Sequence, residues 1–502
     1  MEVNSQRSGP HALYTAAQVR ELDRLAIEQQ GIPGYTLMSR AGEACWQCLQ
    51  ARWPAARSLQ VLCGTGNNGG DGFVVARLAH AANWQVQVLQ LGDAGQLQGD
   101  ALTAYNDYVE AGGQLLPFTG STVLEADVLV DAMLGSGIDR PLTGNWQLAV
   151  EQLNASSSPL LSVDIPSGLQ ADTGAVSGVA AHADVTLTVI GRKVGLYTGA
   201  GPDYAGDTVF SDLDVPAVVY RQVTAAARLL YRAPPGLLCT PRARTAHKGQ
   251  HGRVLVVGGC EGMGGAVRLA GEAALRSGAG LVSVATHPAH AAFITAACPE
   301  LMCHGVADAR ALKVLVAAAD VLVLGPGLGR SVWAQALLGV VLESAQPRVI
   351  DADALNLLAG APANTDAQVL TPHPGEAARL LGQDIATVQQ DRVAAVRAIA
   401  QQYGGVAVLK GAGTVIHAEA ESPLICAAGN PGMATAGMGD VLSGIIGAFI
   451  AQGLAVHTAA VAAVCVHACA GDAAAGQGER GLLARDVIAA LRGVIQAQGE
   501  SA

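Results

Sequence analysis

Short Val- and Leu-rich runs alternate with glycine-rich loops and helix-like segments along most of the chain. The runs at 58–63, 85–90, 253–257 and 406–409 each end shortly before a glycine or a polar residue. Several are followed by a segment with the apolar spacing of a helix. This order predicts βαβ units whose strands are buried on both faces, as in parallel sheets. We therefore expect an α/β protein built from three-layer αβα domains.

Two helices are expected before the first of these strands. Residues 14–30 have amphipathic spacing with Thr15 as an N-cap, and residues 35–49 form a second helix. The Cys45-x-x-Cys48 spacing lies inside this second apolar pattern, which favours core packing over redox chemistry. We interpret the ten cysteines as reduced and mostly buried, because a chain of this length is no disulfide framework.

Residues 215–244 interrupt the alternation. The segment contains Pro234, Pro235 and Pro241, and a new strand follows it. We place a domain boundary here and expect domains at residues 12–222 and 230–499. A length of 502 residues allows two or three domains with full cores.

Composition restricts the possible partners. The net charge is −11, which argues against a nucleic-acid backbone as a partner. Hydrophobic residues make up 50% of the chain, but we find no uninterrupted apolar run of about 18 residues. The N-terminus lacks the apolar core of a signal peptide. We expect a cytoplasmic protein that binds neither nucleic acid nor membrane.

The first glycine-rich loop, Gly64–Gly72, matches G-x-G-x-x-G after a strand. Asp93 follows the next strand, near the place of a ribose-binding acid, so the spacing alone indicates dinucleotide binding. Asp71, however, is expected at the start of the helix that begins at Phe73, where its charge would repel a pyrophosphate. Asn67 and Asn68 instead suit a cation or a polar ligand. A nicotinamide-dependent oxidoreductase remains an alternative.

Polar residues end three strands of the first domain. Asn68, Asp131 and Asp164 each follow an apolar run. Ligands of open α/β sheets bind outside the carboxyl ends of the strands. We therefore expect the three side chains at one edge of the sheet.

The second domain repeats this pattern and ends it with Gly429–Asp440. Glycines before a helix expose N–H groups, and the helix dipole adds partial positive charge, so this stretch predicts an anion site. Asp440 opens the apolar run and could serve as a general base beside a bound phosphate. Lys410, followed by glycines, suits a nucleotide phosphate.

These residues resemble known families. The second domain is similar to the ADP/ATP-dependent NAD(P)H-hydrate dehydratases of the ribokinase-like fold, through 325–329, 351–356, 371–376 and 430–440. The first domain is similar to the Rossmann-like NAD(P)H-hydrate epimerases, through 67–72 and 163–168. Fused in this order, the two resemble the bifunctional NAD(P)H-hydrate repair enzymes over residues 12–500.

The resemblance implies metabolite repair. The first domain would interconvert the R and S hydrates of NADH and NADPH, and the second would dehydrate the S form at the expense of ADP. Asp164 would be the acid/base of epimerisation, and Asn68, Asp131 and Ser167 would hold a potassium ion. The hydrate would contact Asn67, Asn68, Gly69, Gly70, Asp71, Gly135, Ser136, Gly137, Ile138, Asp139, Arg140 and Pro141.

In the second domain the resemblance makes Asp440 the catalytic base. Ala266, Gly327 and His373 would line the hydrate pocket with it. The adenine nucleotide would bind to Lys410, Gly411, Ala412, Gly413, Thr414 and Gly439. The expected small molecules are NADHX, NADPHX and ADP with Mg²⁺, and the chain is expected to form a homo-oligomer.

One departure concerns the anion site. Ala436 stands where the family is expected to have glycine, and alanine at φ > 0 costs about 1 kcal/mol or more. Either Ala436 takes φ < 0 or the site is reshaped. A small-molecule kinase of the ribokinase-like class, with the first domain as a binding module, would show the same Asp440 and remains the main rival.

Overall fold

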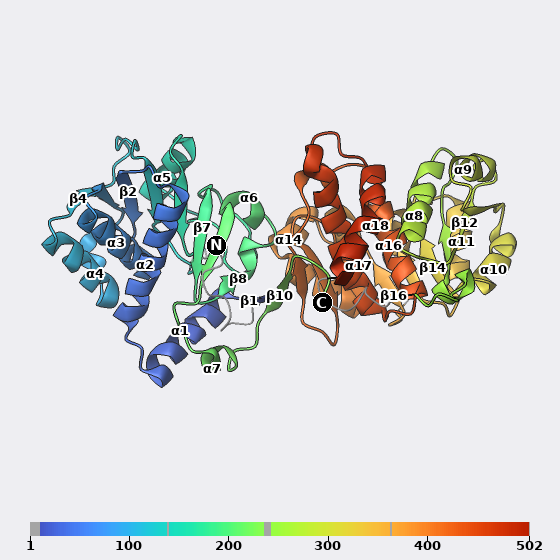
Figure 1. The fold of residues 1–502 in the computed structure, drawn as a ribbon, viewed down its shortest axis with the longest axis horizontal. Coiled ribbons are helices and arrows are strands. Elements are labelled where there is room, and N and C mark those ends of the chain that lie inside the picture. The colour runs from blue at the N-terminus through green and yellow to red at the C-terminus, as the bar shows by residue number, and fades with distance from the viewer. Residues whose placement is uncertain (1–10, 138–139, 235–241, 362–363, 501–502) are drawn as a thin grey trace. The chain divides into compact units, whose positions relative to one another are not determined.

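The computed structural model describes residues 11–137, 140–234, 242–361 and 364–500, and the chain divides into two compact units, Met1–Arg228 and Leu229–Ala502. Each unit is an α/β structure with helices packed on its sheet (Figure 1). The expectation of two αβα domains is confirmed. Ile138 and Asp139, two expected site residues, lie outside the described residues.

The first unit is built on a seven-stranded parallel sheet in the order β4-β3-β2-β5-β6-β7-β9. This unit also contains β1, which pairs with β8 and with β10. Its strands and helices are β1 (Ala12–Tyr14), α1 (Ala16–Gln30), α2 (Gly34–Arg52), β2 (Ser58–Cys63), α3 (Asn67–Ala81), β3 (Gln85–Gln90), α4 (Gly99–Glu110), β4 (Gln114–Pro117), β5 (Val128–Ala132), α5 (Asn145–Ala155), β6 (Leu160–Val163), β7 (Val185–Val189), β8 (Arg192–Lys193), α6 (Gly201–Ala205), β9 (Asp207–Ser211), α7 (Ala217–Tyr220) and β10 (Ala227–Leu230).

Successive side chains of each strand point to opposite faces of the sheet, and a separate core lies on each face of this unit. Val61 and Cys63 of β2 belong to the core shared with α1–α4, whereas Leu62 belongs to the core shared with α5. The strands therefore bury both faces, as their apolar sequence predicted. Helix α1 also begins as expected, because Thr15 and Gln18 form a capping box.

Helix α3 begins six residues earlier than expected. The sequence suggested a loop through Gly72, but the helix starts at Asn67. Its glycines serve close packing rather than a turn: a Cβ at Gly69 would lie 2.1 Å from the Gly64 carbonyl oxygen, and one at Gly72 would lie 2.5 Å from Ala132 Cβ. Asn68 and Asp71 are therefore fixed on a helix.

The second unit has parallel strands in the order β13-β12-β11-β14-β15-β16-β17, extended by antiparallel β18 and β19. Its elements are β11 (Arg253–Val257), α8 (Gly264–Arg276), β12 (Leu281–Thr286), α9 (Ala291–Ala297), β13 (Met302–Gly305), α10 (Ala309–Ala317), β14 (Val321–Leu324), α11 (Val332–Leu342), β15 (Arg348–Ile350), α12 (Ala352–Leu358), β16 (Gln368–Leu370), α13 (Pro374–Leu381), α14 (Ile385–Gln390), α15 (Arg392–Tyr403), β17 (Val406–Leu409), β18 (Thr414–Ala418), β19 (Leu424–Cys426), α16 (Met438–Ala451), α17 (Val456–Ala474) and α18 (Ala484–Glu500).

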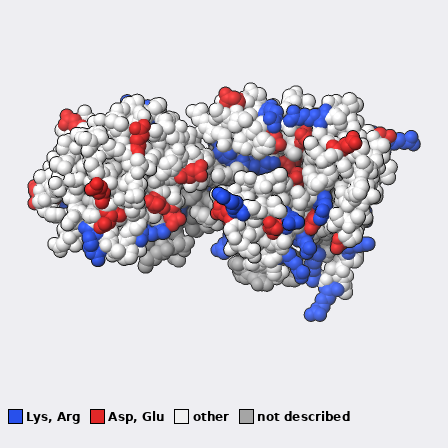
Figure 2. Space-filling view, turned by 90° about the horizontal axis from the view of Figure 1, so that it is seen from above, with Lys and Arg blue, Asp and Glu red and all other residues white. Residues whose placement is uncertain are grey.

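Helices α8, α16, α17 and α18 share one large core with the sheet of this unit. The segment Val456–Gln477 is long and apolar enough to cross a membrane by length and composition, but 67% of its most apolar window is buried inside the protein. It packs here as a core helix. The cysteines that the structure describes are free thiols, and Cys45 and Cys465 are core residues. On the face shown in Figure 2, acidic and basic side chains are interspersed.

Candidate active sites

A cavity of about 1260 Å³ opens at the carboxyl ends of the strands in the first unit. Residues after β2, β3, β5, β6 and β7 line it, together with residues of α1, α2 and α4. Parallel strands present their carboxyl ends at one edge, which brings these loops together. The expected residues that line it are Asn67, Asn68, Asp71, Gly135, Ser136, Gly137, Arg140, Pro141 and Asp164.

Asp164 follows β6 and has a left-handed backbone, with φ of 68°. Its Oδ1 accepts hydrogen bonds from the Lys193 ammonium and from the Val189 N–H, the latter at 3.2 Å. Lys193 is fully buried and also donates to Thr188 Oγ1 at 3.1 Å and to the Val189 carbonyl oxygen at 3.0 Å. The cavity wall therefore contains an ion pair in which Lys193 is fully buried and Asp164 is partly exposed.

Two more carboxyl groups lie near Asp164. Burial, followed by the charges of Asp164 and Asp23, raises the pKa of Asp71 well above its usual range. Burial and the charge of Asp164 also raise the pKa of Asp23. The cavity thus combines an ion-paired carboxylate with carboxyl groups that hold protons more strongly.

Asp131 lies below the cavity and does not line it. It is fully buried, and its carboxylate accepts hydrogen bonds from Ser167 Oγ at 2.6 Å, Ser162 Oγ at 3.0 Å and the Ser167 N–H at 2.8 Å. Burial nevertheless raises its pKa, although these hydrogen bonds oppose the shift. Nearby, the buried Asn68 Nδ2 has no hydrogen-bond partner. Gly69 and Gly70 pack inside α3 and do not line the cavity.

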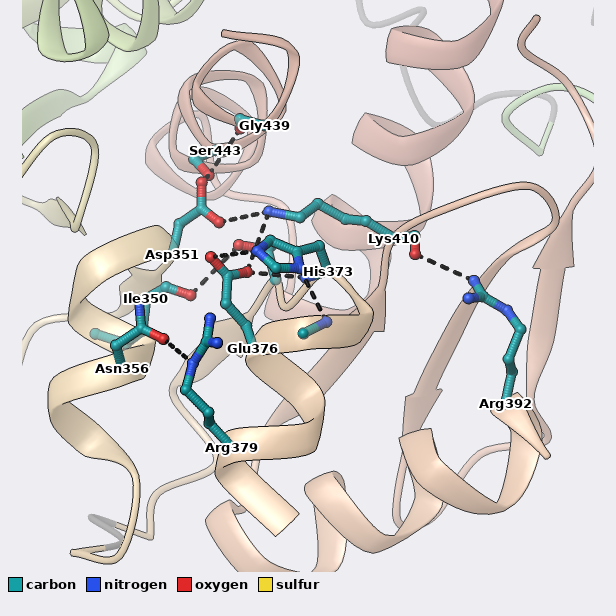
Figure 3. A network of polar contacts seen from close by, with 12 residues as sticks. Ile350, Asp351, Asn356, His373, Glu376, Arg379, Arg392, Lys410, Gly439 and Ser443 are labelled. Atoms are coloured by element: carbon teal, nitrogen blue, oxygen red, sulfur yellow. Dashed lines mark hydrogen bonds and ion pairs between the residues drawn. The ribbon is translucent and has the colours of Figure 1, made fainter. Parts of the chain in front are cut away.

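In the second unit, Asp351 directly follows β15, and its side chain contacts helix α16 (Figure 3). Its Oδ1 lies 2.7 Å from Lys410 Nζ, and its Oδ2 accepts a hydrogen bond of 2.7 Å from Ser443 Oγ. Burial alone would raise the pKa of Asp351, but Lys410 and the hydroxyl groups of Ser443 and Thr371 outweigh it and lower the pKa. Asp351 is therefore a buried anion matched to Lys410.

His373 and Glu376 begin helix α13 on the other side of Lys410. The His373 N–H donates to Glu376 Oε2 at 2.9 Å, and His373 Nδ1 accepts from the Gly375 N–H at 3.0 Å. Glu376 Oε2 lies 3.8 Å from Lys410 Nζ. Burial would lower the pKa of Lys410, but the charges of Asp351 and Glu376 raise it overall. Lys410, expected at a nucleotide phosphate, is thus already ion-paired within the protein.

Asp440 lies in the first turn of α16, two residues after the helix begins. Gly437 takes φ of 90°, whereas Gly439 is helical, so of these two glycines only Gly437 uses a left-handed backbone. Gly439 allows close approach, because a Cβ there would lie 3.1 Å from Lys410 Nζ. Ala436 is absent from the described residues with positive φ, so it takes φ < 0 and carries no left-handed strain.

The carboxyl group of Asp440 has no hydrogen-bond partner among the described residues. Burial, then the charge of Asp351, raises its pKa to about 7, although Lys410 opposes the shift. A carboxyl group with this pKa exchanges protons readily near neutral pH. The helix N-terminus beside it offers N–H groups to an anion.

The other expected residues of the second unit fall into two groups. Ala266 and Gly327 adjoin each other, since a Cβ at Gly327 would lie 3.2 Å from Ala266 Cβ. The 410–414 loop is supported from below by the buried Arg392, whose Nη2 donates to the carbonyl oxygens of Leu409 and Lys410 at 3.1 and 3.2 Å (Figure 3).

Comparison with known proteins identifies the family. The NAD(P)H-hydrate dehydratase family matches residues 254–492, and the family of the YjeF-related protein N-terminus matches residues 34–195. The bifunctional NAD(P)H-hydrate repair enzyme Nnr of Coxiella burnetii is 49% identical over 481 residues, covering 96% of this chain and 98% of that protein. This chain belongs to the bifunctional NAD(P)H-hydrate repair enzyme family.

One further relative and one solved structure support the assignment to the repair enzyme family. The Nnr of Escherichia coli K12 is 43% identical over 487 residues, covering 97% of this chain and 94% of that protein. A solved ribokinase-like superfamily protein from Enterococcus faecalis V583 is 33% identical, covers 55% of this chain and 97% of its own, and superposes with a TM-score of 0.50.

For this repair-family chain, sequence reasoning missed three polar residues that organise the sites. Asp351 and Glu376 entered the sequence analysis only within the ranges 351–356 and 371–376, and Lys193 was given no role there. Each is buried beside an opposite charge. The sequence does contain one signal: a charged residue stands directly after an apolar strand at Asp351 and at Lys410. It does not show that these two residues pair with each other, because the pair forms only in the folded chain.

Proposed function

We propose that this chain repairs hydrated NADH and NADPH, with R/S epimerisation in a domain at 12–222 and dehydration of the S form in a domain at 230–499. The full-length match to the repair enzymes carries the proposal. It is supported by the presence of a separate acid/base candidate in each unit. The two reactions would then act in sequence, since epimerisation supplies the dehydratable form.

The proposed epimerase site is the cavity around Asp164. The hydroxyl-bearing carbon of the hydrate adjoins the ring nitrogen, so it is a hemiaminal carbon. When the hydroxyl proton is removed, the C–O bond becomes a carbonyl as the C–N bond breaks, and the ring nitrogen takes the electron pair and a proton. Closing the ring on the other face of the carbonyl, with loss of the nitrogen proton, inverts the centre. Asp164 would accept and return this proton, while residues 67–71 and 135–141 hold the nucleotide.

A potassium ion would be held by the oxygen atoms of Asn68, Asp131 and Ser167. The residues fit such an ion: Asp131 is a buried carboxylate whose pKa burial raises, and a nearby cation would favour its charged form. Reversing the Asn68 amide would replace its unpartnered buried Nδ2 with an oxygen. Bound potassium would supply positive charge beside the cavity.

For dehydration, ADP would phosphorylate the hydroxyl group and thereby turn it into a leaving group. Asp440 would take the hydroxyl proton as the oxygen attacks the phosphoryl group, and the start of α16 would stabilise its charge. Transfer of the phosphoryl group leaves AMP. Phosphate then departs from the carbon beside the ring nitrogen, and loss of a proton from the adjacent ring carbon forms the double bond of NAD(P)H. Residues 410–414 and Gly439 would hold the nucleotide, and Ala266, Gly327 and His373 the hydrate. Mg²⁺ would be bound chiefly through phosphate oxygens.

The test is clearance of purified R- and S-NADHX, followed by chromatography and by absorbance of reduced nicotinamide. ADP and ATP are compared, and potassium is exchanged for sodium. We expect both epimers to disappear, with AMP and phosphate formed in step with NADH when ADP is supplied. A stable phosphorylated alcohol, with no effect on NADHX, would instead support the small-molecule kinase.

A further inference from the structure

Lys193 is among the largest fully buried side chains described in the chain, and every direction of its ammonium group is used. Its three contacts are a carboxylate oxygen of Asp164, the Thr188 hydroxyl and the Val189 carbonyl oxygen. An ammonium group has three hydrogens to donate, so its position is fully determined. Burying such a charge is costly, and it is tolerated only with a matched partner.

The same contacts restrict Asp164. Oδ1 is occupied by Lys193 and by the Val189 N–H, whereas Oδ2 has no hydrogen-bond partner among the described residues. The side chain keeps 12% of its surface exposed and lines the cavity. Asp164 also holds a left-handed backbone, which is sparsely populated for residues other than glycine. One oxygen is therefore anchored in the protein, and the other remains for the substrate.

Three other acidic groups lie around Asp164. Asp23 of α1 and Asp71 of α3 face it, along with the Cys45 thiol of α2, and all are electrostatically coupled to it. Among the described residues, Lys193 is the cation that forms an ion pair with Asp164. Without it, Asp164 would be a buried carboxylate among other carboxyl groups.

We propose that Lys193 is the positioning residue of the epimerase: it anchors Asp164 through Oδ1, balances its charge and leaves Oδ2 directed at the hydrate. The inference rests on the proposed epimerase activity. Lys193 itself touches no substrate, because its side chain is fully buried. It acts on the rate through the orientation of Asp164, where a displacement of about 1 Å can cost about 100-fold.

Lys193→Met tests this proposal, because it removes the charged ammonium group while keeping an unbranched side chain only one atom shorter. We expect kcat for R-to-S epimerisation to fall by about 100-fold, with little change in KM. The acidic limb of the pH–rate profile should move to higher pH, since Asp164 then faces Asp23 and Asp71 without a cation. In Lys193→Ala, added methylammonium should restore part of the rate.

Three controls separate this role from a general defect. Thermal unfolding of the variant, read together with dehydration of pure S-NADHX by the C-terminal unit, shows whether both units are folded. Arg192→Met removes the neighbouring charge in the sequence, which lies 4.1 Å over the Phe210 ring, and this variant should epimerise normally. A blank without protein corrects for uncatalysed exchange of the epimers.

A double-mutant cycle decides the outcome. In the Asp164→Asn background, Lys193→Met should cause no further loss, because its effect passes through that carboxylate. Wild-type kcat and an unchanged pH profile in Lys193→Met would overturn the proposal, as would fully additive losses. Absence of epimerisation in the wild-type protein would instead refute the epimerase function itself. If Lys193→Met does not fold, Thr188→Val, which removes one of the three contacts, should lower kcat in the same direction.

Discussion

In the N-terminal unit the buried lysine, Lys193, contacts Asp164, the proposed acid/base itself. In the C-terminal unit the corresponding lysine, Lys410, contacts Asp351 instead, while Asp440 lies at a helix start without a hydrogen-bond partner among the described residues. Both sites thus combine a lysine with carboxylates at the carboxyl ends of parallel strands. They differ in which carboxylate forms the ion pair with the lysine: the proposed acid/base Asp164 in the first site, and Asp351 rather than the proposed base in the second.

This difference matches the two reactions. Epimerisation returns the same proton that it removes, so a carboxylate fixed in place is sufficient. Dehydration needs a base that accepts a proton as the phosphoryl group is attacked, and a pKa of about 7 makes Asp440 responsive near neutral pH. Burial, then the charge of Asp351, raises the pKa of Asp440, and Lys410 opposes these effects only in part.

The largest expected effect separates the two carboxylates. Asp440→Asn should lower dehydration of S-NADHX by about 1,000-fold, within the range for loss of a general base, and leave epimerisation intact. Asp164→Asn should do the reverse, so that S-NADHX is consumed while R-NADHX accumulates. Chromatography of the two epimers measures both. Loss of both activities together in either folded variant would contradict two independent sites.

The fold was predictable because its signals are local. The strands at 58–63, 85–90, 253–257 and 406–409 are found where the apolar runs lie, and Thr15 caps α1. The start of α3 was wrong, because the glycines at 69–72 resemble a loop locally but are required by tight packing against β2 and β5. That contact is made only in the folded protein.

The candidate sites were predictable at the level of motifs, and less so at the level of contacts. Asn68, Asp71 and Asp164 do line one cavity. The pairing of Lys410 with Asp351 spans 59 residues of sequence, and no local pattern reports it. The pKa of Asp440 depends on that distant pair, so the sequence predicted which residue is the base but not that its pKa is raised.

Lys410→Met sharpens the comparison, because it removes the cation from the C-terminal cluster alone. Lys410 opposes the upward shift of the pKa of Asp440, so its loss should raise that pKa further. We expect dehydration near neutral pH to fall by about 100-fold, with partial recovery at higher pH. Lys313→Met, at an exposed ion pair with Glu343, is the matched control and should have no effect. Unchanged dehydration in Lys410→Met would show that the pair does not control the base.

The pH dependence of dehydration should follow Asp440. Below a pH of about 7 the carboxyl group is protonated and cannot accept the hydroxyl proton, so kcat/KM should fall about tenfold for each further pH unit. Above that pH the rate should level off. Stopped assays on S-NADHX at saturating ADP, buffered at constant ionic strength, provide the profile. A flat profile across neutral pH would remove Asp440 from the role of base.

The smallest expected effect concerns stability. The pKa of Asp440 is raised from 3.8 to about 7 by folding. Between these values the folded chain binds more protons than the unfolded chain, so the contribution of Asp440 to stability falls as pH rises and is most unfavourable above pH 7. Asp440→Asn should therefore raise Tm by a few degrees at about pH 8, and the gain should diminish toward about pH 4.

Asp164→Asn should instead lower Tm, because it breaks the buried pair with Lys193 and leaves an uncompensated ammonium group. Thermal unfolding of the two variants at both pH values measures these changes in Tm. If Tm changes in the same direction in both variants, the proposed difference between the two carboxylates is wrong.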